Sequence, residues 1–135
     1  MKNINVKQLP IENRELYDAA VEARKKAYIP YSHFAVGAAV RCASGKVYSG
    51  CNIENASYGL CVCGERNAMF NAVGAGERVL ETLCVVADTQ KPVSPCGACR
   101  QVMSEFKIKT IILANLAGDC LVCTLEDLLP YGFSL

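Results

Sequence analysis

The sequence predicts an α/β fold, a single domain over residues 1–135 in which a mixed, five-stranded sheet lies between two layers of helices. Three observations predict it. Segments with helical spacing alternate with short apolar runs, in the order α-ββ-α-β-α-β-β. The run TLCVVAD at 82–88 is almost continuously apolar, as in a strand covered on both faces. The 135 residues suffice for one buried core and fit one domain.

The first half of the chain is expected to supply one helix and one hairpin. Residues 12–28 carry apolar side chains at every third or fourth position, and Pro30 prevents the helix from continuing. Residues 34–42 and 46–53 have strand character and are separated by a short turn that contains glycine. Residues 54–62 are expected to be irregular.

The second half alternates helices and strands. We expect helices over 63–73 and 96–106, and strands over 82–88, 110–116 and 120–125. A helical turn before Pro130 ends the pattern. Because helices that follow strands of such a sheet begin at one edge of it, the helix starts at Cys63 and Cys96 are expected to meet in space.

The composition excludes several classes of function. Lys and Arg number 14 and Asp and Glu 13, for a net charge of +1, so the electrostatic signature of a nucleic-acid-binding protein is missing. No apolar run approaches the roughly 18 residues of a membrane span. The beginning of the chain lacks the apolar stretch of a secretory signal. We therefore expect a cytoplasmic protein with neither nucleic acid nor membrane as a partner.

Nine cysteines stand out in a chain of this length. Nine is an odd number, so they cannot all pair within one chain. In the reducing cytosol, clustered cysteines more often indicate a metal site or catalysis than disulfides.

Three of these cysteines have the spacing of a metal site. Cys96 and Cys99 lie at i and i+3 at a helix start, which puts both sulfurs on one face. Cys63 supplies a third thiolate from the other helix start, where the helix dipole favours ionisation. Three protein ligands leave a fourth position open, which is the arrangement of a catalytic rather than a structural zinc.

Two neighbours of the ligands carry further chemistry. Glu65 lies two residues after Cys63 and can act as the general base beside the metal without binding it. Three thiolates leave a formal charge of −1 on a zinc site. Arg66 or Arg100 could donate hydrogen bonds to the sulfurs and offset that charge, and we favour Arg66, in the first helical turn beside the base.

Five blocks of sequence together resemble the small homotetrameric cytidine deaminases. They follow the family's order along most of the chain: PYSHFAVGAA (30–39), GCNIENASY (50–58), CGERNA (63–68), SPCGACRQVMSEF (94–106) and LLPYGF (128–133). The resemblance implies a cytidine deaminase-like fold and one Zn²⁺ per subunit, bound by Cys63, Cys96 and Cys99. It also implies hydrolytic deamination of cytidine and deoxycytidine to uridine and deoxyuridine in pyrimidine salvage.

The same resemblance implies roles for further residues. Glu65 is the proton shuttle, and the backbone N–H of Gly64 holds the carbonyl of the base. The carbonyl of Ser94 or Pro95 faces the leaving amine. The positions that match substrate contacts on the sugar and ring are Asn52, Glu54 and Phe34. The positions that reach a neighbouring subunit's site are Tyr58 and Phe133, which implies a homotetramer with shared active sites.

Two departures from the family's pattern lie beside the metal motif. Gly64 and Asn67 stand where the family usually has Ala and Thr. Gly64 keeps its N–H but loosens the turn, so we expect an altered rate and unaltered chemistry.

Two alternatives remain open from the sequence. A related deaminase of a nucleoside antibiotic shares the metal motifs, although Asn52 and Glu54 favour a ribose substrate. A structural zinc module is the non-enzyme alternative, because Cys120 and Cys123 together with Cys96 and Cys99 imitate a four-cysteine ribbon. Against the module, residues at i and i+3 of a strand point to opposite faces.

Overall fold

The structure is a computed structural model that describes residues 1–135. Its strands are β1 (Lys2–Asn5), β2 (Val36–Cys42), β3 (Val47–Cys51), β4 (Leu80–Ala87), β5 (Thr110–Asn115) and β6 (Asp119–Cys123). Its helices are α1 (Ile11–Arg24), α2 (Gly64–Gly74), α3 (Gly97–Glu105) and α4 (Leu125–Leu128), with single 3₁₀ turns at Val6–Gln8 and Tyr58–Leu60.

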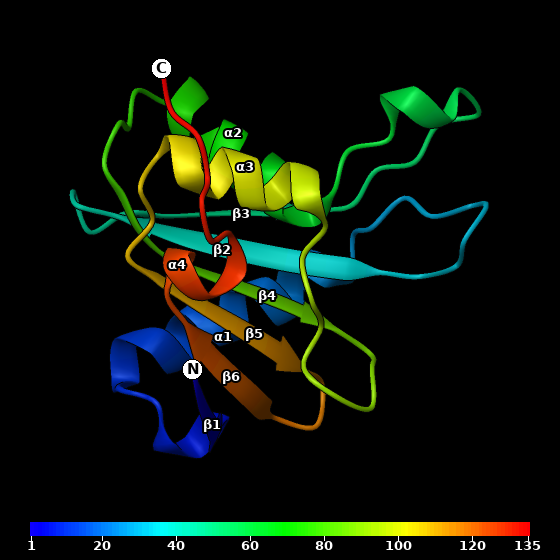
Figure 1. Ribbon diagram of the computed structural model, residues 1–135. Helices are drawn as coiled ribbons and strands as arrows, with labels where there is room; N and C mark the ends of the chain where they lie inside the picture. Colours follow the sequence, from blue (N-terminus) through cyan, green and yellow to red (C-terminus); the bar gives the residue numbers. More distant parts are fainter.

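All the strands form one mixed sheet in the order β1-β6-β5-β4-β2-β3 (Figure 1). Only β4 and β5 are parallel, and every other pair of neighbours is antiparallel. The predicted α/β class and mixed sheet are confirmed. The predicted strand number was too low, because Lys2–Asn5 pairs with β6 from Lys2↔Val122 to Asn5↔Asp119. That segment is short and polar, so only its partner strand makes it a strand.

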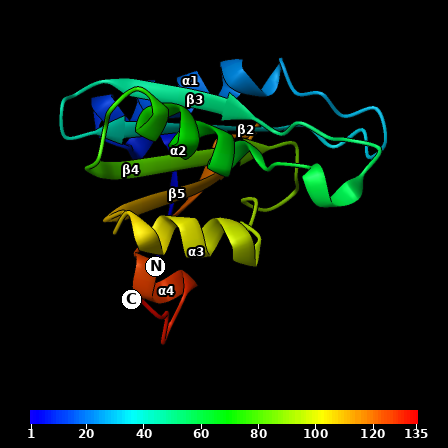
Figure 2. The same ribbon diagram turned by 90° about the horizontal axis from the view of Figure 1, so that it is seen from above.

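Two apolar clusters fill the two faces of the sheet. On one face α1 packs through Leu16 and Ala20 against Val86 and Ile112. On the other face α2, α3 and α4 cover a larger cluster, in which Met69 and Met103 are fully buried. Figure 2 shows α1 and α3 on opposite sides of the sheet. Since residues i and i+2 of a strand share a face, β4 sends Leu83 and Val85 to one cluster and Cys84 and Val86 to the other.

Helix α1 ends earlier than the expected residue 28. Beyond Arg24 the chain leaves the helix, and Tyr28 forms a bridge with Ile53. Its N–H donates to the carbonyl of Asn52 at 3.0 Å, and its carbonyl accepts from Glu54 N at 2.9 Å. These bonds tie the segment before β2 to the segment after β3.

Helix α2 lies directly on β3, the edge strand next to β2. A side chain on Gly50 would collide with the backbone of Ala68, so only glycine permits this approach. The side chains of Asn67 and Asn71 donate to the carbonyls of Cys51 and Ser49 at 2.8 and 2.9 Å. The start of α2 is thereby fixed against the end of β3.

None of the helices combines the length and the apolar run that crossing a bilayer requires.

Candidate active site

Three cysteine sulfurs meet where α2 and α3 begin. Cys63 is the residue before α2 and Cys96 the residue before α3, and their sulfurs lie 3.7 Å apart. Cys99, in the first turn of α3, completes a group whose sulfur atoms all lie within 4.8 Å of one another. The expected meeting of the two helix starts is confirmed.

The electrostatics of this cluster favour a thiolate. Hydrogen bonding from Cys99, and then from Arg66, lowers the pKa of Cys63 to about 5. The bond to Cys63, together with burial, raises the pKa of Cys99. Neither Cys63 nor Cys96 uses its side chain to cap its helix, so both sulfurs are available to a ligand.

Arg66 is the guanidinium that contacts the sulfurs. Its Nη2 donates to Cys63 Sγ at 3.2 Å, and this bond raises the pKa of the guanidinium. Its Nε is buried without a hydrogen-bond partner. Attraction to the charges of Cys63 and Cys99 also favours the cation in this place. Arg100, the other candidate, donates instead to carbonyl and hydroxyl oxygens of the loop before α3 and of α4.

The residues present fit a zinc ion. Three sulfurs within ligand-sharing distance of one another match the trigonal base of a tetrahedral zinc site. A positive side chain on one sulfur offsets the excess charge of three thiolates. This group is the chain's single cluster of three or more potential metal ligands; Cys120 and Cys123 lie in β6, buried and away from it. The four-cysteine ribbon is therefore not formed.

A cavity of about 210 Å³ opens beside the sulfurs. Its lining comes from the segment that leads into β2, the residue after β3, the loop before α3 and the two helix starts, through Phe34, Val36, Asn52, Cys63, Gly64, Glu65, Val93, Ser94 and Cys96. Most of the expected residues are thus brought together. Val36 and Val93 were not expected, because a valine in a strand and a valine in a loop carry no sequence signal that the side chain faces a cavity.

Glu65 is a buried carboxylic acid in the wall of this cavity. It is 4% exposed and lies in the first turn of α2. Burial raises the pKa of the Glu65 carboxyl. A buried carboxyl group with a raised pKa beside a metal site is suited to taking up and releasing a proton.

Asn52 and Phe34 are joined at the mouth of the cavity. Asn52 Nδ2 donates to the Phe34 carbonyl at 2.8 Å, and Asn52 Oδ1 accepts from Val36 N at 2.9 Å. One hydrogen bond from each function of the amide thereby fixes the segment before β2.

Glu54 lies in a neighbouring depression rather than in the cavity of Glu65. Its Oε1 accepts from the backbone N–H groups of Tyr31 and Ser32 at 3.0 and 3.1 Å. Hydrogen bonding from Ser32 lowers the pKa of Glu54. With Tyr31, Ser32, Tyr58 and Cys61 it lines a second cavity, of about 320 Å³.

Two expected residues stand apart from the cavity of Glu65 within one chain. Tyr58 is 76% exposed and stacks edge-on against Tyr31, with ring centroids 6.2 Å apart. Phe133 is 67% exposed in the tail after α4.

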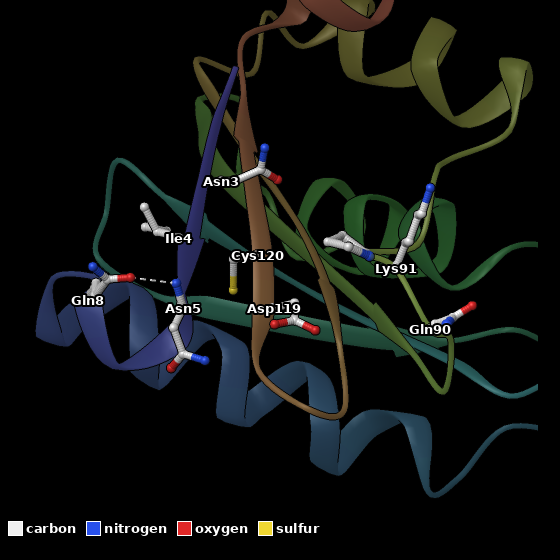
Figure 3. Close-up of a pocket in the computed structure, with 9 residues that line it drawn as sticks. Asn3, Ile4, Asn5, Gln8, Gln90, Lys91, Asp119 and Cys120 are labelled. Atoms are coloured by element: carbon white, nitrogen blue, oxygen red, sulfur yellow. Dashed lines mark hydrogen bonds between the residues drawn. The ribbon is translucent and has the colours of Figure 1, made fainter.

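The largest cavity, of about 470 Å³, contains none of the expected site residues (Figure 3). It lies against β1 and the start of β6, with Asn3, Asp119 and Cys120 in its wall. Gln90 and Lys91, from the loop after β4, close its other side. Size alone does not identify the site in this molecule.

Comparison with known proteins identifies the family. Residues 10–115 match the family described as "Cytidine and deoxycytidylate deaminase zinc-binding region". A cytidine deaminase of Halalkalibacterium halodurans is 48% identical over 92% of this chain and 96% of its own length. One of Sporosarcina psychrophila is 52% identical over 84% of this chain and 85% of its own. The crystal structure of cytidine deaminase from Burkholderia pseudomallei superposes with a TM-score of 0.85 and 50% identity, covering 89% of this chain and 98% of that one. The chain therefore belongs to the zinc-binding cytidine and deoxycytidylate deaminase family.

Proposed function

We propose that the chain is a single-domain, zinc-dependent hydrolase that deaminates cytidine and deoxycytidine to uridine and deoxyuridine. One observation carries the proposal: a buried carboxylic acid, Glu65, shares a 210 Å³ cavity with two members of a three-cysteine cluster. The relatives at 48–52% identity bear the name of this activity. They make the antibiotic-deaminase alternative the weaker one.

Cys63, Cys96 and Cys99 would hold one zinc ion per subunit. When bound, zinc acts as a Lewis acid that lowers the pKa of water and so supplies a nucleophile near neutral pH. Arg66 supports this site by neutralising the thiolate of Cys63.

Glu65 moves the protons of the reaction. It accepts a proton from the attacking water and delivers it to N3 while the oxygen bonds to C4 of the ring. The C4–N4 bond then breaks, and the remaining proton of the water leaves through Glu65 on the amine as ammonia. Cytidine and one water thus become uridine and ammonia, and the carboxyl returns to its starting state.

The remaining cavity residues position the nucleoside. The backbone N–H of Gly64 is assigned to the base carbonyl, and Phe34 packs on the ring. Asn52 and Glu54 are assigned to the ribose hydroxyls, for which Glu54 has a second carboxylate oxygen beyond the one bonded to the backbone. These contacts favour a free nucleoside over a nucleic acid as the substrate, and we assign the enzyme to pyrimidine salvage in the cytoplasm.

We further propose a homotetramer with shared active sites. Tyr58 and Phe133 are large, exposed and absent from the lining of the Glu65 cavity in their own chain, as expected of side chains that enter a neighbour's site. Analytical ultracentrifugation of the zinc-loaded protein tests this, with a monomer as the contradicting result.

The activity is tested by ultraviolet spectroscopy of cytidine mixed with purified, zinc-loaded protein. Conversion to uridine by the wild type and not by Glu65→Ala establishes the reaction and the role of Glu65 together. No conversion with one zinc bound per chain refutes the proposed substrate. Near-normal turnover by Glu65→Ala refutes the proposed base.

A further inference from the structure

Arg100 grips the loop that forms one wall of the active-site cavity. The residue follows Cys99 in α3, and its side chain folds back along the first turn. Nε donates to the Pro95 carbonyl at 2.9 Å, and Nη2 donates to the Ser94 hydroxyl at 2.9 Å. Nη1 donates to the Leu128 carbonyl, the last residue of α4, at 2.7 Å. One planar guanidinium therefore connects the loop in the cavity wall to the end of α4.

These bonds distinguish two neighbouring carbonyls. Pro95 is buried, does not line the cavity, and has its carbonyl oxygen engaged by Arg100. Ser94 lines the cavity, and its carbonyl oxygen accepts no hydrogen bond in the chain. Because Ser94 and Pro95 are adjacent, the hydrogen bond that orients the Pro95 carbonyl toward Arg100 also fixes the orientation of the Ser94 carbonyl.

The backbone around Ser94 has little freedom left. A residue before proline is confined to extended conformations, and proline fixes its own φ. On the preceding side, Val93 N donates to the Ala114 carbonyl of β5 at 3.2 Å. Arg100 supplies the remaining restraint, on the side of the metal-bearing helix.

We propose that Arg100 is a positioning residue for the leaving amine. By holding Pro95 and the Ser94 hydroxyl, it aims the Ser94 carbonyl into the cavity as the acceptor for the 4-amino group of the nucleoside. This inference rests on the proposed deamination. It selects one of the two carbonyls that the sequence left open and assigns the residue that fixes it.

The test compares Arg100→Gln and Arg100→Lys with a matched control, Arg14→Gln. Arg14, on α1, makes the same kind of bond: its Nε donates at 3.1 Å to the carbonyl of Leu9, five residues earlier in the chain. Each variant is measured for zinc content, melting temperature, kcat and KM for cytidine, and Ki for uridine. Uridine carries an oxygen in place of the amine, so it has no proton to donate to the Ser94 carbonyl.

We expect kcat for cytidine to fall about 10- to 100-fold in Arg100→Gln, because a displacement of a substrate contact by about 1 Å can lower the rate by up to about 100-fold. Arg100→Lys should fall between that variant and the wild type, since one ammonium cannot reach three oxygens in the geometry of the fork. Zinc content and Ki for uridine should stay at wild-type values, and Arg14→Gln should match the wild type in turnover.

Three results would overturn the inference. One is wild-type kcat in both Arg100 variants. The second is a rise in Ki for uridine by the same factor as the loss of kcat/KM for cytidine, which would show general damage to the site. The third is a wild-type protein that does not turn over cytidine, which removes the proposed function as well and so differs from the first two. If Arg100→Gln fails to fold, Arg100→Lys decides between these outcomes.

Discussion

Arg66 Nη2, in the first turn of α2, lies 3.2 Å from the sulfur of Cys63, the residue that precedes the helix. The pair places a permanent positive charge on a sulfur that would otherwise add to the negative charge of the zinc site. A metal ligand and the group that tunes it thus come from the same four residues of the sequence.

Arg66→Gln is expected to lower zinc affinity, kcat or both by about 10- to 100-fold, the usual cost of removing a partner of a metal ligand. The measurement is zinc competition with a chromophoric chelator, together with turnover. Arg78→Gln is the control, because Arg78 donates only to the backbone carbonyls of Val73, in the last turn of α2, and of Glu77. Equal zinc affinity and equal kcat in Arg66→Gln and wild type would contradict the assignment.

Glu65→Gln keeps the shape of the side chain and removes its ability to exchange protons. Turnover of cytidine is expected to fall by at least about 10²–10⁴-fold, because Glu65 acts in more than one proton transfer. Zinc content by atomic absorption should remain at the wild-type value, which separates loss of the base from loss of the site. A variant that retains a tenth of wild-type kcat would contradict the mechanism.

Glu54→Gln tests both the loop and the sugar contact. The folded-state pKa of Glu54 lies below its unfolded value of about 4.3, chiefly through hydrogen bonding from Ser32. The carboxylate therefore contributes stability that is fully present above pH 4.3 and is lost as the pH falls through the folded-state pKa. The difference in unfolding free energy between wild type and Glu54→Gln should be constant from pH 7 to about 5 and shrink below it.

The control for this pH series is Glu15→Gln, since Glu15 is exposed on α1 and makes no hydrogen bond. In activity, Glu54→Gln should impair cytidine more than free cytosine. Equal losses on the two substrates would count against a ribose contact.

Tyr17→Phe removes a buried hydrogen bond between α1 and the sheet. The hydroxyl donates to the Asn115 carbonyl at the end of β5 at 2.9 Å. We expect a loss of about 1 kcal/mol in the free energy of unfolding, measured by urea denaturation. Tyr131→Phe should leave the free energy of unfolding unchanged, because Tyr131 is fully exposed. An equal loss of stability in that control would contradict the assignment of the effect to the buried hydrogen bond.

Gly50→Ala tests the contact between β3 and α2. The added methyl would meet the backbone of Ala68, so we expect a loss of about 1–3 kcal/mol or more in stability by urea denaturation. Gly74→Ala, at the end of α2, meets no atom within 4 Å and should instead stabilise by about 0.4–1 kcal/mol. Equal stabilities of the two variants would show that the close approach carries no cost.

The sequence predicted those parts of the molecule that depend on local periodicity. The apolar run that became β4 and the helix starts at Cys63 and Cys96 follow from patterns of a few residues, and the topology of the sheet then brings the cysteines together. Strand β1 escaped prediction because its four residues gain their strand character only by pairing with β6.

The sequence did not predict the backbone contacts of three polar side chains, Asn52, Glu54 and Arg100, for a related reason. Each binds backbone atoms of a distant segment, and nothing in a side chain's identity says which carbonyl or N–H it will meet. Arg100 could equally have reached a sulfur by its position in the sequence. The fold decides, because the end of α4 and the loop before α3 lie within the reach of its guanidinium.

The two asparagines of α2 also bear on how the protein avoids aggregation. Asn52 N bonds to the Val36 carbonyl, so the carbonyls of Ser49 and Cys51 point away from β2 along the open edge of the sheet. Asn67 and Asn71 occupy both. An unpaired edge of this kind is a template onto which a strand of another chain can add. The two amides protect that edge, because they occupy carbonyl acceptors that a strand of another chain would need for pairing.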